Sequence, residues 1–156
     1  MEPRSGGPTS AAVDVLGDRW TLLILRDVVF GDRRHFRALL TGSAEGIASN
    51  ILADRLVRLV DAGILVRGTA ARGQRARYSL TEAGIRTLPV IAALGSWGLD
   101  WRPDPAGGHS REQVVRDEGP AFLDELMDEL RVRHLGAPSE PRDGPGPFER
   151  LDAAVD

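Results

Sequence analysis

The fold is decided by the stretch Gly46-Ile-Ala-Ser-Asn-Ile-Leu-Ala-Asp-Arg-Leu-Val-Arg-Leu-Val-Asp-Ala-Gly-Ile-Leu-Val66. Apolar residues recur here every three or four positions, which predicts an amphipathic helix over 48–62. One side of this helix carries Ile51, Leu52, Leu56, Leu59 and Val60, and the other carries Ser49, Asn50, Ala53, Asp54, Val57 and Arg58. Gly63 is placed to end the helix, and the apolar residues 64–66 then predict a strand.

A β-hairpin is predicted directly after this helix. Its strands are expected over 64–66 and 75–80, joined by a turn-rich loop over 68–74. The tip, Ala71-Arg72-Gly73-Gln74-Arg75, carries two cations and a glycine that tolerates unusual dihedral angles. Four arginines and no acidic residue lie between positions 62 and 81. Such a local excess of positive charge favours contact with a polyanion.

Three helices are predicted before the amphipathic helix and one after the hairpin. The first is capped by Thr9 or Ser10 and extends through residue 16, and the second is capped by Asp18 and ends at residues 31–32. The third is short and ends near Gly42. The helix after the hairpin runs from 81 toward 97 or 101, and Pro89 predicts a kink or a late start.

This order of elements is typical of a winged helix-turn-helix, in which one helix enters the major groove and the hairpin, or wing, reaches the DNA backbone or minor groove. We therefore expect a mainly α fold with a small β-hairpin wing and a C-terminal helical extension. Residues 1–9 are expected to be a flexible tail, and 10–102 the DNA-binding and dimerisation domain. Residues 103–135 should form a linker and an acidic helical extension, and the Pro/Gly-rich residues 136–156 should be disordered.

Composition and charge exclude several classes of protein. The 156 residues contain no cysteine, which excludes disulfides, thiolate nucleophiles and zinc–sulfur sites. No apolar run approaches the ~18–20 residues of a membrane span, and the N-terminus lacks a signal-peptide pattern, so we expect a cytoplasmic protein. Residues 1–110 hold 14 Arg against 11 acids, whereas 111–156 hold 6 Arg against 12 acids. The net charge is thus positive over residues 1–110 and negative over 111–156.

Several motifs in order resemble the HxlR-type bacterial transcriptional regulators. They are Asp14-Val-Leu-Gly-Asp-Arg-Trp-Thr-Leu-Leu-Ile-Leu-Arg-Asp27, Arg34-His-Phe36, residues 46–56, Asp61-Ala-Gly-Ile-Leu65, Tyr78-Ser-Leu-Thr-Glu-Ala-Gly84 and Leu94-Gly-Ser-Trp-Gly98. The resemblance covers residues 8–101 and implies a homodimeric DNA-binding regulator whose terminal helices build the dimer interface. Two features depart from the family: Gly7 stands where many members carry a cysteine, which excludes thiol sensing, and an acidic segment of roughly fifty residues follows the family region.

Candidate DNA-binding and dimerisation residues follow from this arrangement. On the 48–62 helix they are Ser49, Asn50, Ala53, Asp54 and Arg55; on the wing they are Arg72, Gln74, Arg75 and Arg77. The helix face could instead be merely solvated, and Arg55 could equally pair with an acid inside the domain. Asp54 is the weakest candidate, because phosphates repel a carboxylate. Dimer contacts are expected from Leu88, Ile91, Leu94 and Trp97.

The remaining candidate sites have structural interpretations. Trp20, Trp97 and Trp101 are expected to pack in the core rather than to line an effector pocket. The stripe from Phe122 to Leu130 should pack on its own domain or on a partner subunit, with Glu125, Asp128 and Glu129 on the solvated side. The three histidines lack metal-ligand spacing, so no metal is expected. Because the chain has no cysteine, no Gly-rich phosphate loop and no paired nucleophile and base, no cofactor and no enzymatic activity are expected.

The sequence therefore predicts a sequence-specific transcriptional regulator, a repressor, which binds a two-fold operator in double-stranded DNA as a homodimer without thiol-based sensing. Whether a small-molecule effector controls it is left open. The alternative is a winged-helix module that binds another protein and has no specific DNA binding.

Overall fold

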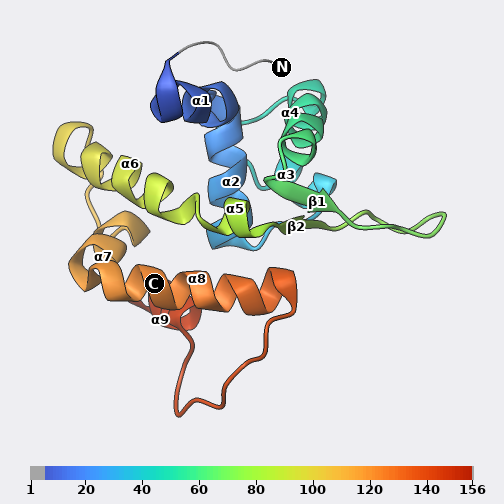
Figure 1. The fold of residues 1–156 in the computed structure, drawn as a ribbon. Helices are drawn as coiled ribbons and strands as arrows, with labels where there is room; N and C mark the ends of the chain where they lie inside the picture. The colour runs from blue at the N-terminus through green and yellow to red at the C-terminus, as the bar shows by residue number, and fades with distance from the viewer. Residues whose placement is uncertain (1–5, 156) are drawn as a thin grey trace. The chain divides into compact units, whose positions relative to one another are not determined.

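The computed structural model describes residues 6–155 of the chain. Its elements in chain order are α1 (Gly7–Leu16), α2 (Arg19–Gly31), α3 (Phe36–Thr41), α4 (Ser49–Asp61), β1 (Leu65–Arg67), β2 (Tyr78–Leu80), α5 (Glu82–Ile85), α6 (Leu88–Trp101), α7 (Arg111–Glu118), α8 (Pro120–Leu135) and α9 (Pro147–Val155) (Figure 1). The chain divides into two compact units, one ending at Gly84 and the other beginning at Ile85.

The N-terminal unit begins with α1 and α2. Helix α1 starts at Gly7, earlier than the predicted cap at Thr9 or Ser10, because Pro8 in its first turn needs no hydrogen-bond partner for a backbone N–H. Asp18 caps α2 as predicted: its side chain accepts a hydrogen bond from the backbone N–H of Thr21 at 2.9 Å. The predicted flexible tail lies mostly outside the described residues, but its last three residues belong to α1.

Helices α3 and α4 form the helix-turn-helix, and α4 agrees with the predicted amphipathic pattern. Its apolar side is buried at Leu52, Leu56 and Leu59, each at most 1% exposed. Helix α4 contacts α2, α3 and β1, so this leucine row forms the centre of the N-terminal core. The chain leaves the helix through Gly63, whose φ of +74° is a left-handed conformation that side chains other than glycine adopt at a cost.

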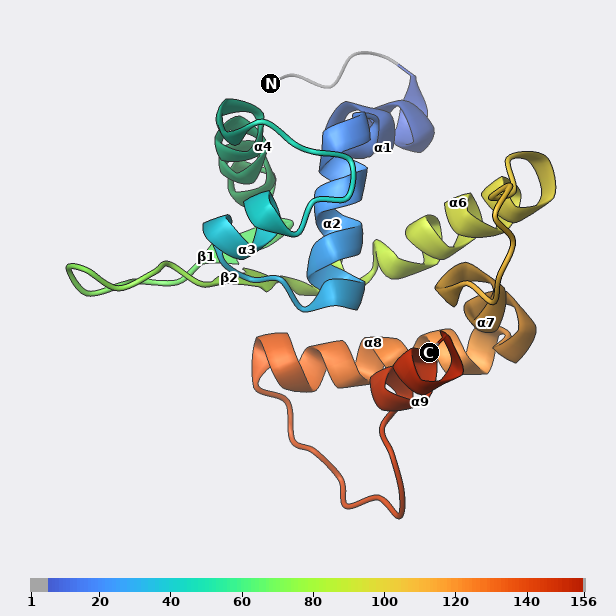
Figure 2. The same cartoon turned by 180° about the vertical axis from the view of Figure 1, so that it is seen from behind.

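The two strands form an antiparallel hairpin in the register Leu65–Leu80, Val66–Ser79 and Arg67–Tyr78. The second strand begins at Tyr78, not at Arg75 as predicted. Pairing continues one step further through the N–H of Gly68, which donates to the carbonyl of Arg77 at 2.8 Å. Beyond that point the wing loop extends away from the helices of its unit, as both views show (Figures 1 and 2), so its residues have few neighbours to pair with.

The predicted helix after the hairpin is divided into α5 and α6. Pro89 lies in the first turn of α6, where a missing N–H costs nothing, and it could not lie in the interior of one continuous helix without breaking a hydrogen bond. The late start that Pro89 predicted is therefore confirmed.

The C-terminal unit packs α6 to α9 around its own core. Phe122, Leu126 and Leu130 of α8 are buried, and α8 contacts α6, α7 and α9. The stripe from Phe122 to Leu130 was predicted to pack either on its own domain or on a partner subunit, and in the structure it packs within its own unit. Helix α7 begins directly after Ser110, whose side chain caps it by accepting a hydrogen bond from the N–H of Gln113 at 3.2 Å.

One boundary prediction for this region was wrong. The tail over 136–156 was expected to be disordered, but α9 forms there and buries Phe148 and Leu151 against the unit. The domain was expected to end at residue 102, directly after α6, and α6 packs closely on α7 within the compact unit that begins at Ile85. At Gly95 an added Cβ would lie 2.7 Å from Cγ of Glu112, so only glycine allows this approach.

None of the helices described over residues 6–155 is long and apolar enough to cross a membrane.

Candidate nucleic-acid interface

The exposed face of α4 is polar and small, as the sequence predicted. Ser49, Asn50, Ala53 and Asp54 are all exposed in the first half of the helix. The buried leucines hold the opposite face, so these four residues point away from the core. Small side chains at 49 and 53 let a helix approach base edges closely, and the amide of Asn50 can donate and accept at once.

Arg55 is held inside the N-terminal unit. Its Nε donates to Oδ2 of Asp18 at 2.8 Å, its Nη2 to Oδ1 of Asp18 at 3.3 Å, and its Nη1 to Oδ2 of Asp54 at 2.6 Å. Its side chain is only 16% exposed. Of the two roles that the sequence left open for Arg55, this geometry favours the internal ion pair over contact with DNA.

Asp18 is the centre of this arrangement. Hydrogen bonding from Arg55 is the largest influence on it and, with the bonds from Thr21, lowers the pKa of Asp18 to about 2 although burial acts in the opposite direction. One carboxylate thus caps α2 and anchors α4, which fixes these two helices to each other.

The negative charge of Asp54 is balanced by two neighbouring arginines. Its carboxylate pairs with Arg55 and also with Nε of Arg58, at 3.0 Å one helical turn further on. The repulsion that a bare carboxylate would exert on nearby phosphates is reduced by these two cations. Asp54 therefore holds two arginines in place.

The wing carries unpaired positive charge. Arg72, Gln74, Arg75 and Arg77 are exposed, as predicted, and none of these three arginines forms an ion pair with a residue in the described part of the chain. Arg67 on β1 and Arg37 on α3, which line a pocket together with Arg75, are also exposed and form no ion pair within the described chain. Arg67 was counted in the basic stretch but not chosen as a site residue, and Arg37 was missed because nothing local in the sequence links it to the wing.

The base of the wing is tied to the segment that precedes α3. The N–H of Tyr78 donates to the carbonyl of Arg34 at 2.7 Å, and Nε of the buried Arg34 donates to the carbonyl of Tyr78 at 2.9 Å. Nδ1 of His35 lies 3.1 Å from the carbonyl oxygen of Ala76. These bonds hold the root of the wing in one position, although the tip extends freely.

The predicted dimerisation residues fall on two different faces of α6. Leu88 is fully buried within the chain, so its assignment as a dimer contact was wrong: its side chain completes the core and cannot touch a partner. Ile91 is half-buried, whereas Leu94 and Trp97 are 49% and 57% exposed.

An apolar row, here called the α6 stripe, runs along the exposed face of this helix. Its residues are Val90, Leu94, Trp97 and Trp101, at spacings of four, three and four, and the last is 64% exposed. The expectation that Trp97 and Trp101 pack in the core was therefore wrong for the single chain. The sequence does contain a signal for this stripe, because its four apolar residues recur every three or four positions from Val90 onward.

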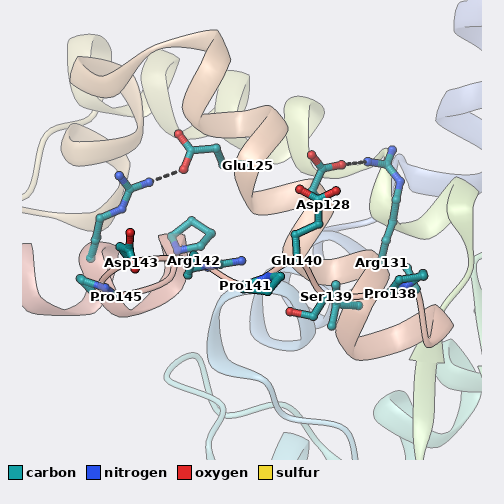
Figure 3. A pocket seen from close by; sticks show the side chains of 14 residues that line it. Glu125, Asp128, Arg131, Pro138, Ser139, Glu140, Pro141, Arg142, Asp143 and Pro145 are labelled. Carbon is teal, nitrogen blue, oxygen red and sulfur yellow. Dashed lines mark hydrogen bonds and ion pairs between the residues drawn. The ribbon is translucent and has the colours of Figure 1, made fainter.

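A pocket in the C-terminal unit is lined by charged side chains that already pair with one another. It has a volume of about 680 Å³ and lies between α8 and the loop over 136–146 (Figure 3). Arg131 donates to Asp128, Arg150 to Glu125, and Arg142 to Glu129, which leaves these arginines without free charge for a ligand. Among the described residues no three His, Asp or Glu side chains gather as a metal site would require.

Comparison with known proteins identifies the region that this interface occupies. Residues 15–105, more than half of the chain, match the model of the family described as HxlR-like helix-turn-helix. An uncharacterized HTH-type transcriptional regulator from Mycobacterium tuberculosis is 39% identical over 103 residues, covering 65% of this chain and 63% of that protein. The chain thus spans less than two thirds of the length of this curated relative.

Solved structures show the same fold. The crystal structure of PA1607, described as a candidate transcription factor, has 36% identity and a TM-score of 0.62, covering 75% of this chain and 80% of that one. The reduced form of the transcriptional regulator YodB from Bacillus subtilis has 24% identity and a TM-score of 0.52, covering 67% of this chain and 99% of that one. At this lower identity the likeness concerns the fold alone.

Proposed function

The chain belongs to the HxlR-like helix-turn-helix family, and we propose that it is a sequence-specific DNA-binding repressor of transcription that acts as a homodimer in the cytoplasm. In this proposal α4 lies in the major groove and the wing contacts the DNA backbone or the minor groove. The two halves of the dimer then read a two-fold operator, with half-sites about one helical turn or a multiple of it apart.

One observation carries the DNA-binding proposal: the arginines of the wing are exposed and form no ion pair within the described chain. In the same unit, Arg26, Arg33, Arg55 and Arg58 all pair with carboxylates. The carboxylates of this unit thus pair with arginines outside the wing, and the wing arginines keep their charge exposed to solvent. Phosphate oxygens are the polyanionic partner that such an extended, basic hairpin fits.

Base reading is proposed for the first half of α4. Ser49, Asn50 and Ala53 are the exposed side chains that no internal contact occupies, and Asn50 is long enough for a bidentate contact with adenine. Arg55 and Asp54 have a supporting role in this proposal, because their charges are used within the unit. Gln74 and Arg77 contact the backbone together with Arg72 and Arg75.

Dimerisation is proposed through the α6 stripe. Four large apolar side chains, 43% to 64% exposed, form one continuous row that a single chain leaves in water. A second copy of the same helix would cover both rows at once, which is how two-fold interfaces are built. In place of Leu88 and Ile91, the contact residues are therefore Val90 and Trp101 together with Leu94 and Trp97.

Control of this regulator cannot depend on a thiol within these 156 residues, because they contain no cysteine. We therefore propose regulation by a non-thiol route. Repression is the outcome we expect, since a dimer that covers two successive turns of DNA at an operator excludes other proteins from it.

The test is a shift assay of the full-length protein against a library of genomic fragments, followed by sequencing of the retained DNA. We expect a shared motif with two-fold symmetry and competition by non-specific DNA only at large excess. Retention of all fragments alike would contradict sequence-specific reading. If no fragment is retained at low salt, the winged helix serves as a protein-binding module instead.

A further inference from the structure

A pocket at the base of the wing, here called the wing-base pocket, lies wholly within the N-terminal unit. It has a volume of about 360 Å³ and is lined by Phe36, Arg37, Leu40, Arg67, Arg75, Ala76 and Tyr78. Helix α3 forms one wall and the hairpin the other; the two elements lie side by side in both views (Figures 1 and 2). Its volume is that of a small-molecule site.

The pocket walls are held in position before any ligand arrives. The hydrogen bonds of Arg34 and His35 to Tyr78 and Ala76 join the start of α3 to the start of β2. Arg34 also donates to the hydroxyl of Ser79. Since Phe36 and Arg37 directly follow these residues, their backbone is held next to Tyr78 on the opposite wall. A preformed site loses less conformational entropy on binding than a mobile one.

The lining combines two kinds of chemistry. Phe36, Leu40 and Tyr78 provide apolar surface. Phe36 is 36% exposed, so part of its ring remains uncovered by the rest of the chain. Arg37, Arg67 and Arg75 provide three exposed guanidinium groups without an ion pair in the described chain. Guanidinium groups bind carboxylates with paired, parallel hydrogen bonds, whereas the apolar surface favours a ring or a hydrocarbon group.

We propose that the wing-base pocket binds a small carboxylate that carries an aromatic or similarly bulky apolar group. The carboxylate is held by Arg37 and Arg67 with Arg75, and the apolar group lies against Phe36, Leu40 and Tyr78. A bare inorganic anion fits less well, because the apolar wall would strip its hydration without replacing it.

Binding here has a consequence for DNA that rests on the proposed function. The pocket includes Arg75, one of the wing arginines assigned to phosphate contact, together with Arg67 on β1. A bound carboxylate neutralises part of this charge and therefore weakens the hold of the wing on DNA. The small acid acts as an inducer that releases the repressor.

The direct test uses the full-length protein without DNA and 1-naphthoate as the probe, with binding measured by isothermal titration calorimetry. Acetate, which lacks the ring, and 1-naphthalenemethanol, which lacks the charge, are the control compounds. We expect saturable binding of one naphthoate per chain and no saturation with either control. Arg37→Gln and Arg67→Gln should each weaken naphthoate binding about tenfold, since each removes a charged hydrogen-bond donor.

Arg72→Gln is the matched control variant, because it removes the same charge from the same hairpin outside the pocket. It should bind naphthoate like the wild type. Equal weakening by Arg72→Gln would mean that only overall positive charge attracts the acid, which overturns the site. Saturable binding of the alcohol, or no saturation by naphthoate at millimolar concentration, would overturn it as well.

The effect of naphthoate on DNA affinity is measured separately from the binding of naphthoate to the protein. Naphthoate should raise the dissociation constant of the wild-type protein for its operator. Phe36→Ala, which keeps every charge but removes an apolar wall, should bind DNA normally and lose this response. If naphthoate binds but DNA affinity does not change, the inducer role is wrong. Failure of the protein to bind DNA at all would contradict the proposed function without affecting the calorimetric result.

Discussion

Asp18 and Arg55 join α2 to α4, the helix that presents the candidate reading surface. Although they lie 37 positions apart in the chain, Nε of Arg55 donates to Oδ2 of Asp18 at 2.8 Å, and the same oxygen accepts from the backbone N–H of Thr21 at 2.9 Å. The start of α2 and the middle of α4 are thus fixed to each other through one carboxylate. Weakening this contact should lower the free energy of unfolding and change how that free energy depends on pH.

The first prediction concerns the charge of Asp18. Asp18→Asn preserves a good helix cap but removes the ion pair, so the free energy of unfolding at pH 7 should fall by about 1 kcal/mol. This figure is smaller than the pKa shift alone would give, because the Asp18 side chain is 35% exposed and water screens the pair. Urea denaturation followed by circular dichroism measures the loss.

The sign of the pH dependence follows from the lowered pKa of about 2. A carboxyl whose pKa is lower in the folded than in the unfolded state, where it is about 3.9, stabilises the fold above the unfolded value. The stability difference between wild type and Asp18→Asn should therefore be constant above about pH 5 and shrink as the pH falls from 4 toward 2. Arg55→Gln should cost a similar amount, and the double variant should lose little more than either single one. Additive losses would contradict the coupling.

The second prediction concerns the wing arginines. Arg72→Ala and Arg75→Ala should weaken specific and non-specific DNA binding alike, because phosphate contacts do not depend on sequence. Each should reduce the slope of log affinity against log salt by about 1, or by about 2 when both wings of a dimer are engaged. Fluorescence anisotropy over a range of salt concentrations gives the slope.

The matched control for the wing variants is Arg142→Ala. It removes the same charge from the loop before α9, where Arg142 pairs with Glu129 at 3.0 Å. Its salt slope should equal that of the wild type. A folded Arg72/Arg75 double variant with an unchanged slope would exclude the wing from the DNA interface.

The third prediction concerns Asn50. Asn50→Ala should flatten the base preference at one position of each half-site, at a cost of about 1–3 kcal/mol of discrimination, and leave non-specific affinity nearly intact. Binding to an operator library before and after the substitution measures this preference. Asp61→Asn, at the far end of the same helix, should leave the preference unaltered. Equal weakening on every sequence would instead assign Asn50 to backbone contact.

The fourth prediction concerns the α6 stripe. Leu94→Asp or Trp97→Asp places a charge in the centre of the proposed dimer interface, so each should shift the protein from dimer to monomer at micromolar concentration. Light scattering coupled to size exclusion measures the mass. Leu135→Asp, which also puts a charge at an exposed apolar position, 47% exposed at the end of α8, should not change the mass. A wild-type monomer under these conditions would remove the stripe from any role in self-association.

Short-range sequence patterns were sufficient to predict the local elements of the N-terminal unit. The three- and four-residue spacing of Leu52, Leu56 and Leu59 requires a helix with one buried side, because no other regular structure gathers those positions on one face. The cap at Asp18 and the late start of α6 at Pro89 also follow from short-range chemistry. The polar face of α4 was predicted for the same reason.

Tertiary structure alone decided what those side chains do. Arg55 could be assigned to an internal pair only once the fold brought Asp18 to it, since the partner of a long cation depends on contacts far apart in the chain. Likewise, the rotation of α6 about its axis buried Leu88 and exposed Trp97, a choice that depends on which neighbours cover the helix. The burial of Phe148 and Leu151 stabilises α9 although proline and glycine dominate the loop before it. Short-range patterns specify which elements form, whereas burial and pairing depend on non-local contacts that only the folded chain creates.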